Sequence, residues 1–129
     1  MSDGTPEVIA LLDWELCTLG HPHADLGYVC ANYHADNLPT GQFKELDFQA
    51  LGIPTEQEFL DLYCRYSGWE NIRNHLFFVV FSFFRSAAII QGVYKRGLDG
   101  NAASQKALML GHMARVRAEN AGRIVEQNL

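Results

Sequence analysis

Apolar residues follow one another without a break from Val8 to Leu12, directly after a short stretch that favours a turn. The run is too short for a buried helix and is typical of a buried strand, so the pattern predicts a strand at about 7–12. A single strand leaves backbone N–H and C=O groups unpaired along both edges. We therefore expect a preceding segment to pair with it, which would make the strand part of a hairpin.

Helical spacing of apolar residues begins soon afterwards. It predicts a helix at 22–34, where a proline suits the first turn, and another at 56–67. Thr55 and Glu58 fit a capping box at the start of the second helix, and Gly68 fits its end. The expected apolar faces comprise Leu26, Val29, Cys30 and Tyr33 in the first helix and Phe59, Leu62, Tyr63 and Tyr66 in the second.

The second half of the chain predicts two longer helices. The segment 70–96 has no proline and is apolar nearly all round in its middle, which is typical of a central helix buried on several sides. A last helix is expected at about 102–127. Between the earlier helices, 36–54 holds prolines and glycines without a sustained period, so its role cannot be deduced from the pattern. Together these elements predict a mainly α fold with a short strand or hairpin at the N-terminus, in a single domain over 1–129.

The composition supports a folded core and makes some classes of binding partner less suitable than others. Of the 129 residues, 48% are hydrophobic and 19% are charged, which excludes a disordered chain. Lys and Arg number 10 against 15 Asp and Glu, so the net charge is −5 and nucleic acid is a poor candidate partner. The longest apolar run, at 76–84, is shorter than the roughly 20 residues that cross a bilayer, so we expect it to form core and not a membrane span.

The first residues lack the basic and apolar regions of a secretory signal. The three cysteines form no CxxC pair, and Cys17, His21, His23 and His34 match no zinc spacing. We therefore expect reduced cysteines in a cytoplasmic protein.

Asp13 and Glu15 are the first candidates for chemistry. Asp13 comes directly after the apolar run, and a carboxylate at a strand end can be held rigidly toward a hard cation such as Mg²⁺. The alternative is an aspartate that only caps the turn after the strand. Glu15 could add a second carboxylate to the metal site, or it could be an ordinary exposed glutamate in a loop.

Two motifs lie close together here, a DWE triplet at 13–15 and a GxPxxDL pattern at 20–26. At this spacing they resemble the second half of the aminoglycoside phosphotransferase and choline kinase-like family, which has a protein-kinase-like fold. The stretch 83–96 resembles the subgroup of this family that is fused to acyl-CoA dehydrogenases in larger proteins. The resemblance covers the whole chain and implies the helical C-terminal part of the large lobe.

The resemblance also implies roles for two aspartates. Asp13 matches the aspartate that binds Mg²⁺ bridging the phosphates of ATP. Asp25 matches an aspartate that braces the catalytic loop from the start of the next helix, and an ordinary charge in the first helical turn is the alternative. Mg²⁺ and ATP are thus the implied cofactors of the complete enzyme, and a small hydroxylated molecule is its implied substrate. The subgroup favours a hydroxylated acyl compound over an aminoglycoside.

The family's catalytic loop, HGDxxxxN, comes just before the strand, and no HxDxxxxN occurs in these 129 residues. Its aspartate orients the substrate hydroxyl and its asparagine holds metal. Also absent are the N-terminal lobe, its phosphate-covering loop and its strand lysine. We therefore expect no catalytic residue in this chain and no phosphoryl transfer by the chain alone.

Arg85 lies among phenylalanines in the predicted central helix, and a buried guanidinium needs a partner. An ion pair with Asp13, Asp25 or another acid is the favoured interpretation. The alternative is a contact with an anionic substrate, because Arg85 and Arg96 fall on one helical face.

Two functions from different classes remain. The first is a fragment of an ATP- and Mg²⁺-dependent phosphotransferase that acts on a small hydroxylated molecule. The second is a non-catalytic helical interaction module or inactive remnant that self-associates. In either case we expect a homodimer, since the strand at 7–12 or the helix at 70–96 would otherwise leave an uncovered surface.

Overall fold

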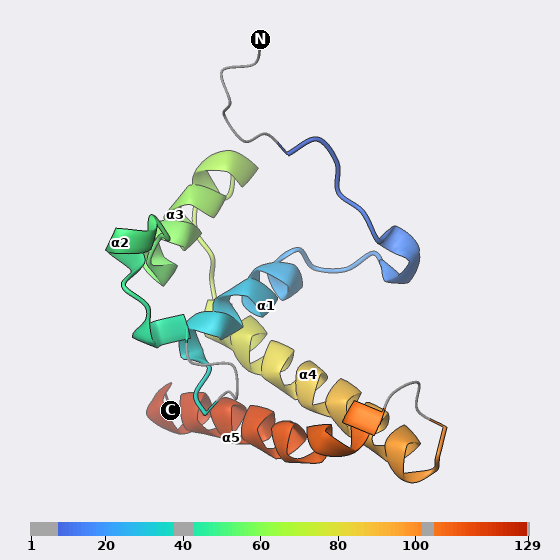
Figure 1. Ribbon diagram of the computed structural model, residues 1–129. Coiled ribbons are helices and arrows are strands. Elements are labelled where there is room, and N and C mark those ends of the chain that lie inside the picture. Colours follow the sequence, from blue (N-terminus) through green and yellow to red (C-terminus); the bar gives the residue numbers. More distant parts are fainter. Residues whose placement is uncertain (1–7, 38–42, 102–104, 129) are drawn as a thin grey trace.

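A computed structural model describes residues 8–37, 43–101 and 105–128. These residues form α-helices joined by turns of 3-10 helix, which confirms the mainly α class (Figure 1). The elements in chain order are η1 (Trp14–Leu16), α1 (His23–His34), η2 (Phe43–Glu45), α2 (Phe48–Leu51), α3 (Glu56–Ser67), α4 (His75–Leu98), η3 (Gln105–Leu110) and α5 (Gly111–Asn128).

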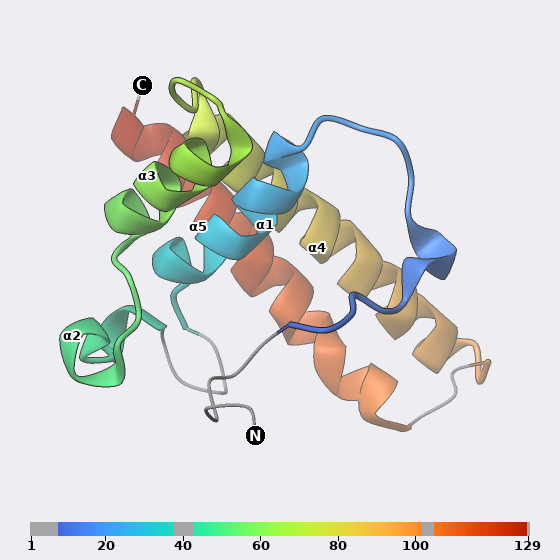
Figure 2. The same ribbon diagram turned by 90° about the horizontal axis from the view of Figure 1, so that it is seen from above.

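The two longest helices, α4 and α5, lie side by side and run in opposite directions (Figures 1 and 2). Helix α1 packs across α4, and α3 lies near the beginning of α4. The C-terminal end of α5 returns to the start of α4, where Asn128 and Asn74 line one shallow cavity. The fold is therefore a helical layer built on α4, with the N-terminal segment 8–20 running outside it (Figure 2).

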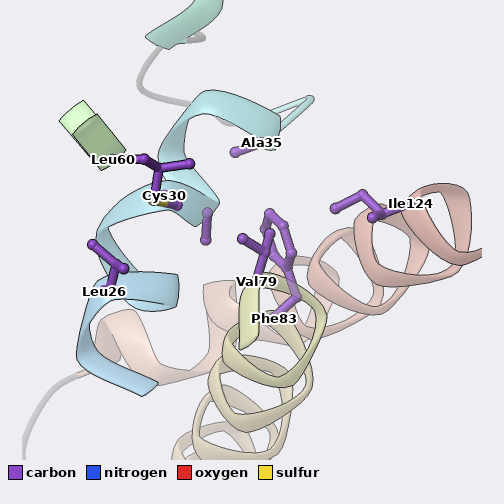
Figure 3. Packing of buried hydrophobic residues seen from close by; sticks show 8 residues of the cluster. Leu26, Cys30, Ala35, Leu60, Val79, Phe83 and Ile124 are labelled. Atoms are coloured by element: carbon purple, nitrogen blue, oxygen red, sulfur yellow. The ribbon is translucent and has the colours of Figure 1, made fainter. Parts of the chain in front are cut away.

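The core forms where four helices meet (Figure 3). Val79 and Phe83 of α4 are fully buried and belong to one hydrophobic cluster with side chains from the other three helices. The cluster comprises Leu26, Cys30, Ala31, Ala35, Leu60, Val79, Phe83 and Ile124. Burial of such side chains stabilises each helix mainly through its neighbours, since isolated helices of this length are marginal in water.

Gly27 permits the close crossing of α1 and α4. A Cβ atom added to Gly27 would lie 2.5 Å from the carbonyl carbon of Phe78 and 2.6 Å from its oxygen. No side chain fits at that separation, so the backbones touch here. The crossing fixes the beginning of α1 against the beginning of α4.

Asn120 ties α5 to the end of α1. Its side-chain oxygen accepts from the Asp36 N–H at 2.8 Å, and its amide donates to the carbonyls of Asp36 and Val116 at 3.1 and 2.8 Å. Arg123 adds a hydrogen bond to the His34 carbonyl and an ion pair with the Asp36 carboxylate at 3.0 Å. Because these backbone groups satisfy it, Asn120 can be buried without the cost of an unpaired polar group.

The expected helices at 22–34 and 56–67 are confirmed by α1 and α3. Helix α3 begins with the predicted capping box, in which the Thr55 hydroxyl accepts from the Glu58 N–H and the Glu58 carboxylate accepts from the Thr55 N–H. It ends at Gly68, which has a left-handed φ of 78°. The buried faces differ from the prediction in detail, since Val29, Leu62 and Tyr66 are exposed.

The expected strand at 7–12 is not formed in the part that the structure describes. Residue 7 lies outside the described residues, and 8–12 are exposed and have no regular secondary structure. The physical reason is the absence of a pairing partner: 8–37, 43–101 and 105–128 contain no other strand with which to form a ladder.

The two long helices also differ from the sequence prediction. Helix α4 begins at His75 and not at 70, after Asn74 in a left-handed conformation. The helix expected at 102–127 is divided into η3 and α5, and 102–104 lie outside the described residues. A 3-10 turn is common where an α-helix starts, but the six residues of η3 are more than such turns usually have.

Helix α4 is buried on one side only, whereas the sequence predicted burial on several sides. Val79, Ser82 and Phe83 are buried, while Phe77 and Phe84 remain 64% and 65% exposed. Among the described residues, α4 alone is long and apolar enough to cross a membrane by length and composition, a property that core helices also show. A large apolar face is therefore uncovered in this chain.

Candidate functional site

Asp13 lies in an exposed turn directly after the apolar run. It has a left-handed backbone with φ of 68° and ψ of 49°, which aspartate tolerates better than most residues. Within the described residues its carboxylate makes no hydrogen bond or ion pair, and it does not cap η1. The carboxylate is thus free to bind an external group.

Glu15 is in the same turn and is also exposed. The turn is held by two hydrogen bonds, from the Trp14 indole to the Leu11 carbonyl at 2.7 Å and from the Cys17 N–H to the Trp14 carbonyl at 3.0 Å. Two carboxylates are therefore presented two positions apart on one short turn.

These two carboxylates suit Mg²⁺ in their chemistry. Mg²⁺ prefers oxygen ligands and is commonly held by one or two carboxylates together with phosphate oxygens and water. In the described part of the chain, no group of three or more His, Cys, Asp or Glu side chains is arranged to hold a metal ion. Asp13 and Glu15 thus fit a metal that is bound jointly with a nucleotide.

Asp25 is exposed in the first turn of α1. A negative charge there is stabilised by the helix dipole, whatever else the residue does. No side-chain partner of Asp25 is found in the described residues. Its geometry is compatible both with a helix-end charge and with a brace for a neighbouring segment.

The favoured ion pair of Arg85 is absent from the described residues, and that interpretation is corrected. The guanidinium carbon of Arg85 instead lies 5.6 Å from the centre of the Tyr28 ring, in a cation–π contact. Arg85 is only half-buried, so water can solvate its charge and no acid is needed. Arg96 is exposed in the last turn of α4.

A ring cluster that the sequence did not single out lies between the start of α1 and the connection from α3 to α4. The His23 ring centre is 4.5 Å from that of His21, 4.5 Å from Trp69 and 5.5 Å from Phe78. A cavity of about 570 Å³ borders this cluster. The GxPxxDL pattern contains both histidines, but only the fold brings Trp69 and Phe78 to them.

A second histidine cluster joins three helices. Nε2 of His34 in α1 is 2.8 Å from a carboxylate oxygen of Glu56 in α3, and Nε2 of His75 in α4 is 3.8 Å from the same oxygen. Nearby, burial and then the Glu56 charge raise the pKa of the Cys30 thiol to about 12. Cys30 is therefore a protonated core residue and not a nucleophile.

Comparison with known proteins identifies the class to which this arrangement belongs. The model of the phosphotransferase enzyme family matches residues 1–66, which include Asp13, Glu15 and Asp25. The chain belongs to the phosphotransferase enzyme family.

The relatives point to the expected subgroup. The chain is 47% identical over 120 residues to acyl-CoA dehydrogenase family member 10 of Mus musculus, covering 89% of this chain and 11% of that protein. It is 38% identical over 117 residues to acyl-CoA dehydrogenase family member 11 of Homo sapiens, covering 87% of this chain and 14% of that protein. It is also 38% identical over 130 residues to the probable acyl-CoA dehydrogenase IBR3 of Arabidopsis thaliana, covering 95% and 16%.

The chain thus spans between about a tenth and a sixth of the length of these relatives. The resemblance to the segment that such proteins share is confirmed. No solved structure matches the chain.

Proposed function

We propose that this chain is the helical C-terminal part of the large lobe of an ATP- and Mg²⁺-dependent phosphotransferase that acts on a hydroxyl group of a small molecule. The observation that carries the proposal is Asp13, an exposed carboxylate that has no partner among the described residues and lies in a hydrogen-bonded turn, inside the stretch that matches the family. Bound Mg²⁺ and ATP would supply the γ-phosphoryl group and the positive charge that neutralises it during transfer.

In this proposal each candidate residue has a separate task. Asp13 binds the metal, and Glu15 supplies a second carboxylate to it. Asp25 braces the catalytic loop of the complete enzyme from the start of α1. Arg85 and Arg96 contact an anionic part of the substrate, since a guanidinium suits carboxylate and phosphate groups. Arg85 is half-buried and Arg96 is exposed on α4, so both guanidinium groups can be reached by a ligand.

We further propose that the substrate is a hydroxylated acyl compound and that the protein is cytoplasmic. The names of the relatives, acyl-CoA dehydrogenase family members 10 and 11, support the acyl class. A hydroxylated acyl compound in the form of its free acid would carry a carboxylate, for which the two arginines are suited.

The chain by itself should not transfer phosphate, because no HxDxxxxN motif occurs in it. The test uses the purified chain with ATP, Mg²⁺ and a panel of hydroxylated acids, together with Asp13→Asn and the control Glu126→Gln. The control removes an exposed carboxylate on α5, outside the matched residues. We expect no turnover by any of the three proteins.

Binding tests the metal role separately. Mn²⁺ can replace Mg²⁺ and reports its own binding through water relaxation. Asp13→Asn should weaken binding of Mn²⁺ with ATP by about tenfold, since a charged ligand is lost, whereas Glu126→Gln should leave it unchanged. Equal binding in Asp13→Asn and the unaltered chain would contradict the metal role. Turnover that survives removal of contaminating kinases and is lost in Asp13→Asn would contradict the expected inactivity.

A second candidate function is a non-catalytic module that self-associates through its apolar surface. The uncovered phenylalanines of α4 favour it. This function predicts no metal-dependent nucleotide binding, so the Mn²⁺ experiment distinguishes the two candidates.

A further inference from the structure

The cavity beside His21 and His23 has the size and lining of a ligand site. It holds about 570 Å³, within the range of small-molecule pockets. One wall comes from the residues just before and within α1, and the other from the α3–α4 connection and the first turn of α4. The lining comprises His21, His23, Ser67, Gly68, Trp69, Glu70, Asn71, Arg73, Asn74 and Phe78.

His23 gives this cavity an unsatisfied polar atom. The residue is only 4% exposed, and its Nε2 atom is buried and has no hydrogen-bond partner among the residues that the structure describes. The Nδ1 atom of the neighbouring His21 accepts from the His23 backbone N–H at 3.2 Å, and among the described residues no hydrogen bond joins the His21 ring to Nε2 of His23. Burial and the proximity of His21 lower the pKa of His23, so the ring is neutral at pH 7. A neutral ring nitrogen can pair with a polar group of a ligand.

Trp69 offers a surface for a planar ring. The residue is 43% exposed, and the planes of the His21 and His23 rings are tilted against its indole by 45° and 56°. Neither ring lies parallel to the indole, so neither of them occupies a face of it by parallel stacking. Phe78 differs, because His21 already stacks on it at 5.1 Å and 27°.

The charged side chains of Arg73 and Glu70 line the cavity and restrict the charge of a ligand that could bind there. Arg73 is exposed and has no ion pair in the described residues. Glu70 lines the same cavity, so a ligand with negative charge alone would be repelled there. A ligand with an anionic end for Arg73 and N–H or O–H donors for Glu70 would use both side chains.

We propose that this cavity binds a small planar ring molecule that carries hydrogen-bond donors and one anionic group, as a nucleoside monophosphate does. The ring stacks on Trp69, the anionic group pairs with Arg73, and a polar atom of the ligand reaches Nε2 of His23. Binding needs no metal, because Asp13 and Glu15 do not line the cavity. The proposal therefore stands apart from the phosphotransferase site.

The test uses AMP as the probe and Trp69 as the reporter. The chain has two tryptophans, so Trp14→Phe leaves Trp69 as the single fluorophore. AMP is titrated in EDTA, and adenosine and ribose 5-phosphate supply the ring and the anion separately. We expect saturable quenching by AMP, binding of adenosine about tenfold weaker, and no quenching by ribose 5-phosphate.

Matched variants assign the contacts. Arg73→Gln should reduce AMP affinity to that of adenosine, whereas Arg65→Gln, an exposed arginine of α3 outside the cavity, should change nothing. His23→Leu should weaken AMP and adenosine alike. If His23→Leu fails to fold, the exposed Arg73 still provides the decisive comparison.

Two results would overturn the proposal. The first is the absence of saturable quenching by AMP at millimolar concentration, which would show that the cavity does not bind AMP. The second is equal AMP affinity in Arg73→Gln and Arg65→Gln. Since Asp13→Asn should leave AMP binding in EDTA unchanged, failure here and failure of the metal site remain distinguishable.

Discussion

At the scale of single residues, His23 should make the stability of the fold depend on pH. Burial first, and then His21, lower its pKa in the folded state below the ordinary 6.5. As the pH falls below about 6.5, the unfolded chain therefore binds more protons at His23 than the folded chain does. The free energy of unfolding decreases as the pH is lowered from there to the pKa of His23 in the folded state. Above 6.5 this contribution is fully present.

Urea unfolding at about pH 7.5 and about pH 5.5 measures the free energy of unfolding at each pH. The change in this free energy with pH reports the number of protons taken up on unfolding. His23→Leu should lose less stability between the two pH values than the unaltered chain. His112→Gln, which alters an exposed histidine of α5, should behave like the unaltered chain. An identical loss in His23→Leu would contradict the prediction.

Residues that act through their immediate neighbours could be predicted from the sequence. The capping box of Thr55 and Glu58 and the left-handed Gly68 follow from local rules, and the structure has all three. Asn120 and Trp69 could not be found in this way. Their partners are distant in sequence, and only the packing of α5 on α1 and of α1 on α4 brings them together.

At the scale of elements, the crossing of α1 and α4 depends on Gly27. Gly27→Ala would place a Cβ atom within 2.7 Å of three backbone or Cβ atoms of Phe78, so the helices must separate. We expect a loss of about 1–3 kcal/mol in the free energy of unfolding, as for other overpacked cores.

Gly122→Ala is the matched control in α5. Nothing lies within 4 Å of a Cβ atom added at Gly122, so alanine should stabilise that helix by up to about 1 kcal/mol. Urea denaturation of both variants shows whether each substitution raises or lowers the free energy of unfolding. A Gly27→Ala protein as stable as the Gly122→Ala protein would show that the crossing is loose.

Element boundaries were predictable only where a local signal marks them. Helices α1 and α3 have such signals and were predicted within a residue. The stretch before α4 has none, and Asn74 ends the preceding connection with a left-handed φ of 57° that no pattern predicts. The strand at 7–12 failed for another reason, since a strand requires a partner and the described chain has none.

At the scale of the whole molecule, the family could be predicted because two of the motifs that carry the resemblance lie inside the first 66 residues, which the family model matches. The placement of Arg85 could not. Its local sequence is apolar, which suggests burial and an ion pair, yet helix α4 is covered on one side only and leaves the guanidinium half-exposed over Tyr28.

The uncovered side of α4 leads to the last prediction. Phe77 and Phe81 stack on each other with ring centres 6.4 Å apart, and Phe84 continues the exposed stripe one turn further. Such a surface is typical of an interface, and the net charge of −5 is too small to keep two chains apart. Because residues 8–12 form no strand, we expect a homodimer that packs α4 against α4.

Analytical ultracentrifugation over a wide concentration range tests this arrangement. The chain should sediment as a dimer at high micromolar concentration, and Phe84→Glu should shift it to monomer, since a carboxylate would be buried in the interface. Leu51→Glu changes an apolar residue of α2 that is also more than half exposed and should leave the dimer intact. A chain that remains monomeric and still melts cooperatively would show that the fold is stable with the outer face of α4 exposed to water. The observation that favours a self-associating module would then no longer support it.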